Sequence, residues 1–165
     1  MLKLAFDNVS GDLFQLSDKL IEDGLKASRE SERLRIILPI HRKQDARVQR
    51  MINFLQPGTY IRPHQHPLEH ATESLVLIQG SIRFYTFDDK GTVLTKNEVH
   101  SKPIPGVMDI EPKVWHSFVV LEENTMLFEC KKGPYDANTD KTFAKWAPAE
   151  NSEEAITWLK RLQQF

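Results

Sequence analysis

The chain has 165 residues, and its 22 basic and 23 acidic side chains give a formal net charge of −1 at pH 7. This balance excludes a global attraction to nucleic acid or membranes, so we expect neither as a partner. The length suits one hydrophobic core, and we expect residues 1–165 to form a single domain.

The sequence also indicates in which cellular compartment the protein is expected. The first residues lack the basic region, apolar core and cleavage site of a signal peptide, and no apolar run is long enough to span a bilayer. Cys130 is the only cysteine, which excludes an intrachain disulfide. Its apolar surroundings favour a small buried hydrophobe over a nucleophile. We therefore expect a cytoplasmic protein.

Residues 1–47 are expected to form an N-terminal helix and arm. Helical spacing of apolar residues predicts a helix over 16–31, with Ser17 as its N-cap and Gly24 as a weak point. The apolar run 34–38 predicts a strand or an extended arm. Basic residues are frequent between 26 and 50: Arg29, Arg33, Arg35, Arg42, Lys43, Arg47 and Arg50. A solvated face is the commoner explanation, and a site for a phosphate-bearing ligand or anionic partner is the alternative.

The segment 48–131 has the period-two pattern of strands separated by turns. The expected strands are 48–55, 59–62, 74–79, 81–87, 92–99, 107–111, 116–121 and 125–131. Asp88-Asp-Lys-Gly91 predicts a hairpin. Many short strands at this spacing indicate an antiparallel sandwich or barrel.

The segment 132–165 is expected to be an ordered tail followed by a helix. The aromatic residues Phe143 and Trp146 should anchor the tail to the surface. For a helix over 152–163 we predict Asn151 as the cap and Glu154 as its capping-box partner. Its apolar stripe would be Ile156, Leu159 and Leu162, with Trp158 packing beside it.

Three histidines and one glutamate form a candidate metal site. In an extended strand His64 and His66 point the same way, Glu73 follows on the next strand, and His116 is distant in sequence. Three imidazoles and a carboxylate suit one divalent transition metal ion, with iron, manganese, nickel and zinc all compatible. We predict as metal ligands His64, His66, Glu73 and His116; the alternative is a set of scattered surface histidines. Glu69 and His70 remain alternates for Glu73.

These residues resemble the cupins, which are small β-barrels with a metal bound inside. The first cupin motif is matched by Gly58, His64, His66, Glu73 and Gly80, with six rather than three or four residues between His66 and Glu73. In the second motif Lys113 replaces a glycine and Val120 replaces an asparagine. The resemblance implies an all-β protein, a single cupin (jelly-roll) antiparallel β-barrel with flanking N- and C-terminal helices.

The longer spacing resembles the WbuC family of cupin-fold metalloproteins. The resemblance runs from about residue 33 to the C-terminus and includes the segments 50–53, 57–67, 115–117, 132–135 and 140–148. Members often lie near genes for lipopolysaccharide O-antigen sugars. A role in lipopolysaccharide biosynthesis is what this resemblance implies, and it leaves the reaction open.

Strand alternation extends the site to two ligand-binding candidates, Tyr60 and Arg62, which should share the face of the histidine pair. Arg62 would hold a carboxylate or phosphate; the alternative is a structural ion pair at the barrel's end. Tyr60 is the nearest candidate acid or base, and the catalytic residues stay unknown. We expect His41 and His100 to be ordinary surface or core residues, although the WbuC family also carries a histidine near His41.

Three classes of function fit these features. The first is a metal-dependent enzyme, an isomerase, epimerase or dioxygenase, acting on a small polar molecule such as a sugar or sugar-nucleotide intermediate. The second is a non-catalytic ligand-binding or sensor cupin, and a metal-free barrel is a weaker third. Whether the protein is an enzyme stays open.

We also expect a homodimer. On the Glu73 strand Leu75 and Leu77 should face inward, and Val76 and Ile78 should face outward and need cover. A second subunit could supply it, or residues 34–38 could add an edge strand to a neighbour. The competing account is that the C-terminal helix covers this face.

Overall fold

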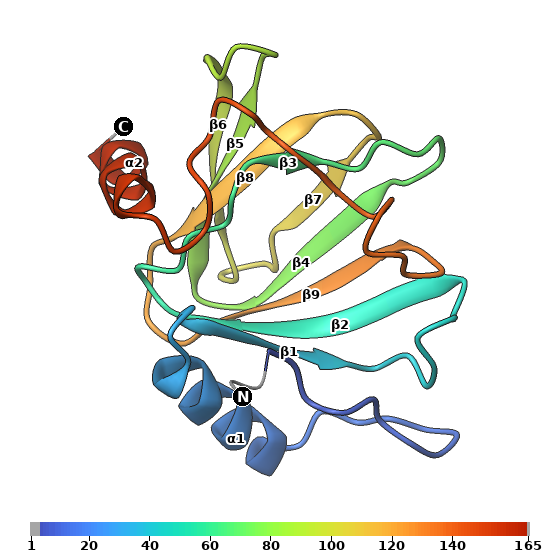
Figure 1. Ribbon diagram of the computed structural model, residues 1–165. Coiled ribbons are helices and arrows are strands. Elements are labelled where there is room, and N and C mark those ends of the chain that lie inside the picture. Colours follow the sequence, from blue (N-terminus) through green and yellow to red (C-terminus); the bar gives the residue numbers. More distant parts are fainter. Residues whose placement is uncertain (1–3, 165) are drawn as a thin grey trace.

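The computed structural model describes residues 4–164, which form two antiparallel sheets packed face to face (Figure 1). Sheet I has the strand order β1-β2-β9-β4-β7, and sheet II has the order β10-β3-β8-β5-β6. The elements are α1 Asp18–Glu30, β1 Arg35–Pro39, β2 Val48–Leu55, β3 His64–Gln65, β4 Glu73–Gln79, β5 Ser81–Phe87, β6 Val93–His100, β7 Val107–Ile110, β8 Trp115–Val120, β9 Thr125–Lys132, β10 Thr142–Phe143 and α2 Glu153–Gln164. The expected jelly roll with a helix near each end is confirmed.

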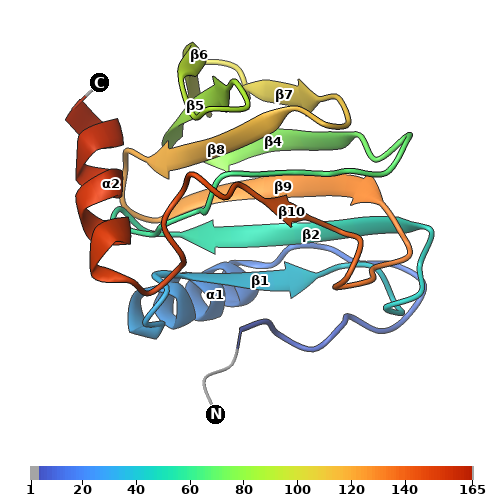
Figure 2. The ribbon, with the colours of Figure 1, turned by 45° about the horizontal axis from the view of Figure 1, so that its top comes forward.

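Most strands lie within a residue or two of their expected bounds, with two exceptions. Residues 59–62 were expected to be a strand but have no ladder; the strand begins at His64 instead. The tail contributes a short strand, β10, which pairs with β3. Figure 2 shows this tail crossing in front of β2 and β9.

Helix α1 covers the outer face of sheet I. Ser17 caps it as expected, accepting a hydrogen bond from the Leu20 N–H. Gly24 lies where a Cβ atom would come within 2.4 Å of the Phe54 ring, so this glycine permits close packing of helix on sheet. The core between them consists of Ile36, Leu38, Ile52, Phe54 and Met126, with Ile21 and Leu25 packed against it.

Helix α2 covers sheet II and lies away from the outer face of β4 (Figure 1). Its N-cap is Ser152, whose hydroxyl accepts from the Ala155 N–H; the expected Asn151 cap and Glu154 capping box are wrong. Asn151 instead takes a left-handed turn at φ 67°. The buried residues of the helix are Ala155, Leu159 and Leu162, whereas Ile156 is exposed.

The outer edge of β1 is occupied by the chain's own N-terminal segment. Ala5 bridges to Ile37, and the Phe6 N–H donates to the Ile37 carbonyl. This contact removes residues 34–38 as an open edge for a second subunit. On β4, Leu75 and Leu77 face inward as expected, and Ile78 is exposed. Neither described helix has the length and apolar character needed to cross a bilayer.

Candidate metal centre

Four buried side chains converge between the two sheets. His64 lies on β3 opposite His116 of β8, His66 follows β3, and Glu73 begins β4. One ligand atom from each lies within 4.8 Å of all the others, so the group could hold a metal ion. The alternates Glu69 and His70 are exposed and stand outside this group.

The hydrogen bonds of the three imidazoles fit metal binding. Each Nδ1 lies beside a backbone carbonyl: His64 with Arg62 at 2.9 Å, His66 with Asp140 at 2.6 Å, and His116 with Val114 at 2.8 Å. A carbonyl only accepts, so each Nδ1 carries the proton and each Nε2 keeps its lone pair.

The inward nitrogens then need a partner. Among residues 4–164 the buried Nε2 atoms of His64 and His66 have no hydrogen-bond partner, and His116 Nε2 lies 3.1 Å from the Glu73 carboxylate. Buried polar atoms of this kind are rare unless an ion or water satisfies them. A divalent ion would satisfy all three.

The electrostatics favour the forms that metal binding requires. Burial, then the charges of Lys141 and His116, hold the pKa of His64 well below its usual range. Burial alone would raise the pKa of Glu73, but the close approach of His116 and His66 holds that pKa well below its usual range. Neutral imidazoles and an ionised carboxylate are the metal-ligating species.

The departure from the second cupin motif leaves its turn intact. Lys113 adopts φ 67°, the left-handed conformation that a glycine adopts without strain, and its N–H donates to the His66 carbonyl at 2.9 Å. This bond ties the β7–β8 turn to the end of β3. Val120, at the motif's asparagine position, is buried in the apolar core.

The two ligand-binding candidates lie in different surroundings, Arg62 in the cavity and Tyr60 beneath α2. Arg62 lines a cavity of about 450 Å³ that is also lined by His64, Glu73 and His116. It donates to the Ala144 carbonyl and stacks on Phe143 rather than forming the ion pair that we considered. Tyr60 instead donates to the Pro148 carbonyl beneath α2, and burial raises its pKa to about 12. The prediction that Tyr60 shares the face of the histidine pair was wrong, because residues 59–62 do not form a strand and their side chains need not alternate.

Sequence reasoning missed an ionic group in the same cavity. Lys131 pairs with Asp140 of the tail at 2.8 Å and lies 3.8 Å from Glu129, which accepts from Asn53. Burial, then the charge of Glu73, raises the pKa of Glu129. On β9, every second residue faces the interior, including Leu127, Glu129 and Lys131. This alternation in the sequence could have predicted that the two charged side chains lie inside.

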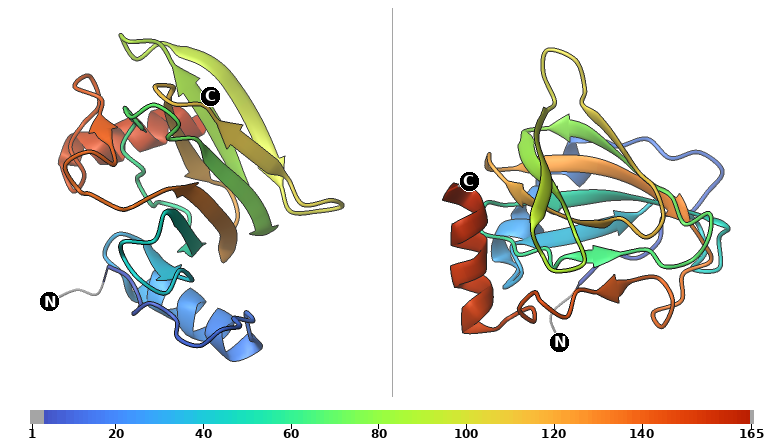
Figure 3. Two further views of the ribbon diagram at one scale, coloured as in Figure 1. Left: turned by 90° about the vertical axis from the view of Figure 1, so that its right-hand side faces the viewer. Right: turned by 90° about the horizontal axis from the view of Figure 1, so that it is seen from above.

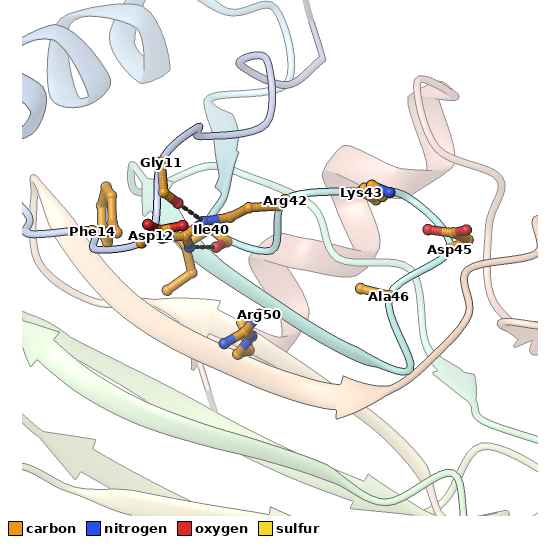
Figure 4. A pocket seen from close by; sticks show the side chains of 9 residues that line it. All are labelled: Gly11, Asp12, Phe14, Ile40, Arg42, Lys43, Asp45, Ala46 and Arg50. Atoms are coloured by element: carbon orange, nitrogen blue, oxygen red, sulfur yellow. Dashed lines mark hydrogen bonds between the residues drawn. The ribbon is translucent and has the colours of Figure 1, made fainter.

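The basic residues between positions 26 and 50 do not form one face. Arg33 and Arg35 bind Glu150, whereas Arg42 donates to the carbonyls of Gly11 and Ile40. Figure 4 shows Arg42 reaching these carbonyls in an outer hollow of about 660 Å³. Arg42 therefore holds the N-terminal segment in place.

Cys130 is only half-buried, which corrects the expectation of a buried hydrophobe. It lies on the outer face of sheet I, paired with Arg50 and Ser74 of the flanking strands. Burial raises the pKa of its thiol, so the thiol is protonated at neutral pH.

Comparison with solved structures supports the fold. A mutant oxalate decarboxylase OxdC from Bacillus subtilis matches with a TM-score of 0.50 and 19% identity over 66% of this chain and 27% of that one. A second mutant matches with a TM-score of 0.50 and 17% identity over 65% and 27%. At these identities the likeness shows the cupin fold alone, and the chain spans 27% of the length of those enzymes.

No curated protein matches the sequence. A family model described as "Domain of unknown function (DUF6016)" matches residues 16–99, about half of the chain. That segment runs from α1 into β6 and contains three of the four candidate ligands. The chain therefore belongs to the family of the domain of unknown function DUF6016.

Proposed function

We propose that this protein is a metal-binding cupin that holds one divalent transition ion with His64, His66, Glu73 and His116 and acts on a small polar molecule. The observation that carries the proposal is the set of imidazoles whose Nδ1 atoms bond to carbonyls while their Nε2 atoms converge on Glu73. Such an ion would polarise a carbonyl or hydroxyl oxygen of the ligand.

The charges of the cavity favour an anionic group on that ligand. Five basic side chains line it, Arg33, Arg35, Arg62, Lys131 and Lys141, against four acidic ones, Glu73, Glu129, Asp140 and Glu150. A divalent ion would add two positive charges, so a carboxylate or phosphate would be attracted. Arg62 offers a flat cationic group held against Phe143.

The resemblance to the WbuC family supports a sugar or sugar-nucleotide intermediate of lipopolysaccharide O-antigen synthesis as the substrate. In its segment 140–148, Asp140 contacts His66 and Phe143 lies under Arg62. Membership of that family and a cytoplasmic location are parts of this proposal.

A non-catalytic ligand-binding or sensor role is the second candidate. Tyr60, the nearest candidate acid or base, contacts α2, and the buried Lys131 is already paired with Asp140. Turnover of sugar phosphates and sugar acids by the metal-loaded protein would favour the enzyme, and saturable binding without turnover would favour the sensor.

Elemental analysis tests the metal site. We expect about one transition ion per chain in the purified protein and almost none in His116→Ala, because a tetradentate group loses one of its ligands. His100→Ala is the matched control, since His100 is an exposed histidine outside the group. Equal metal content in all three proteins would overturn the assignment.

We also propose a homodimer through the outer face of β4 and β7. Val76 pairs with Val107 there, and Ile78 and Val107 are 39% and 65% exposed. Burying these side chains would remove apolar surface from water. Sedimentation at micromolar concentration tests this, with Val107→Asp expected to shift a dimer to monomer; a wild-type monomer would contradict it.

A further inference from the structure

A row of polar side chains crosses the inner face of sheet I from the metal group to His41. Glu73 on β4 pairs with Lys131 on β9, and Lys131 pairs with Gln49 on β2. His41 lies two residues after the end of β1, next to Ile40, whose N–H donates to the Arg50 carbonyl. Neighbouring strands lie about 4.8 Å apart, so the backbones of Glu73 and His41 are separated by about 14 Å.

His41 is 2% exposed, yet it lines the same cavity as the metal group. Its Nδ1 lies 2.9 Å from the Arg50 carbonyl oxygen and 3.1 Å from the Arg50 backbone nitrogen. Nδ1 is therefore occupied by the Arg50 backbone, either as donor to the carbonyl or as acceptor from the N–H. Nε2 is the ring nitrogen left for a ligand, as acceptor in the first case and as donor in the second.

That Nε2 is an unmatched polar atom. It is buried and has no hydrogen-bond partner within residues 4–164. A buried polar atom without a partner is unfavourable, and a hydroxyl group supplied by a ligand, which can both donate and accept, would remove that penalty.

We propose that His41 is a specificity residue whose Nε2 forms a hydrogen bond with a hydroxyl group at the far end of an elongated polyhydroxy acid. The acid group would lie at the metal, and the hydroxylated remainder would follow Lys131 and Gln49. A two-carbon acid at the metal is too short to touch His41 as well. This inference rests on the proposed function and adds the length and chemistry of the ligand.

Two substitutions separate the distal ring nitrogen from the structural role of the ring. His41→Asn keeps a polar atom near the Nδ1 position for the Arg50 backbone and deletes the distal nitrogen. His41→Gln places an amide group, which can donate and accept, near the Nε2 position. Circular dichroism and metal content should match the wild type in both variants. If His41→Asn does not fold, His41→Gln against wild type still tests whether a distal hydrogen-bonding group is enough.

Calorimetry on the cobalt-loaded protein would use three probes: glycolate, gluconate and lactobionate, a gluconate that carries one sugar ring. We expect wild type and His41→Gln to bind lactobionate about tenfold more tightly than glycolate, and His41→Asn to lose that gain while glycolate binding is unchanged. Equal affinities for the three acids in wild type, or a uniform loss for all three in His41→Asn, would overturn the inference. Failure of every acid to bind the metal-loaded wild type would instead contradict the proposed anionic ligand.

Discussion

The two ends of the barrel interior differ although the same strands build both. At one end Leu77 on β4 and Leu127 on β9 face each other in an apolar core. Four residues along the same strands, the inward positions are Glu73 and Lys131. The interior thus changes from apolar to ionisable side chains within one sheet.

This difference separates stability from function. Burial of apolar side chains stabilises the fold, whereas buried charges lose hydration and need partners. At the polar end the partners come from the tail, since Asp140 contacts both Lys131 and His66. Figure 3 shows that the tail and α2 lie on the sheet II side, away from α1. We infer that the apolar end carries stability and the polar end carries binding.

The largest effect should come from the apolar end. Leu77 is 0% exposed, so Leu77→Ala should lower the free energy of unfolding by about 2–5 kcal/mol because it leaves a cavity. Metal content of the folded protein should not change. Leu94→Ala is the control, since Leu94 is 64% exposed. Denaturant titration and elemental analysis would measure both; loss of metal from folded Leu77→Ala would mean that the two ends are not separable.

The second largest effect on the free energy of unfolding is expected at the outer face of sheet I, where α1 packs. Gly24→Ala should destabilise the protein by about 1–3 kcal/mol because the new Cβ meets the Phe54 ring, although alanine favours helix by about 1 kcal/mol. The double variant Gly24→Ala/Phe54→Leu should be less destabilised than the sum of the single changes. Additive effects, or a stabilised Gly24→Ala, would show that the ring moves aside freely.

At the polar end we expect a change in binding instead. Asp140→Asn should lower metal affinity by about tenfold, because the weakened bond to Lys131 loosens the carbonyl that orients His66. Asp136→Asn, on the exposed part of the tail, should leave the affinity unchanged. Competition with a chelator measures both proteins, and equal affinities would indicate that the tail does not support the site.

The smallest effect is a pH dependence at Glu150. Burial works to raise its pKa, but the hydrogen bond to Arg33 and the charge of Arg35 lower it below the ordinary value. Its contribution to stability is therefore present above the unfolded pKa, about 4.3, and is lost as pH falls through the folded pKa. The urea midpoint of wild type should exceed that of Glu150→Gln at pH 7, and the gap should narrow towards pH 3. A constant gap would argue against this linkage.

Local patterns in the sequence predicted most of the fold. Period-two strands, the hairpin at Asp88–Gly91 and the Ser17 cap depend on nearby residues, and the structure has all three. The ligand group was also predictable as a set, because His64 and His66 are two residues apart in an extended segment and so point the same way.

The remaining features depend on tertiary contacts. Tyr60 turns to α2 because no partner strand fixes its alternation, and Ile156 is exposed because α2 rests on Ala155 and Leu159. Lys131 is buried because Asp140, nine residues later, returns to pair with it. The spacing of residues in the sequence does not predict that the chain folds back to place Asp140 beside Lys131.

The most direct test of the central claim is X-ray absorption spectroscopy of the protein loaded with one equivalent of cobalt. We expect scattering from three imidazoles and one carboxylate oxygen at about 2.0–2.2 Å, and loss of one imidazole in His66→Ala. His100→Ala should give the wild-type spectrum. A wild-type spectrum of an ion surrounded by water oxygens alone, or one unchanged by His66→Ala, would contradict the proposed metal centre.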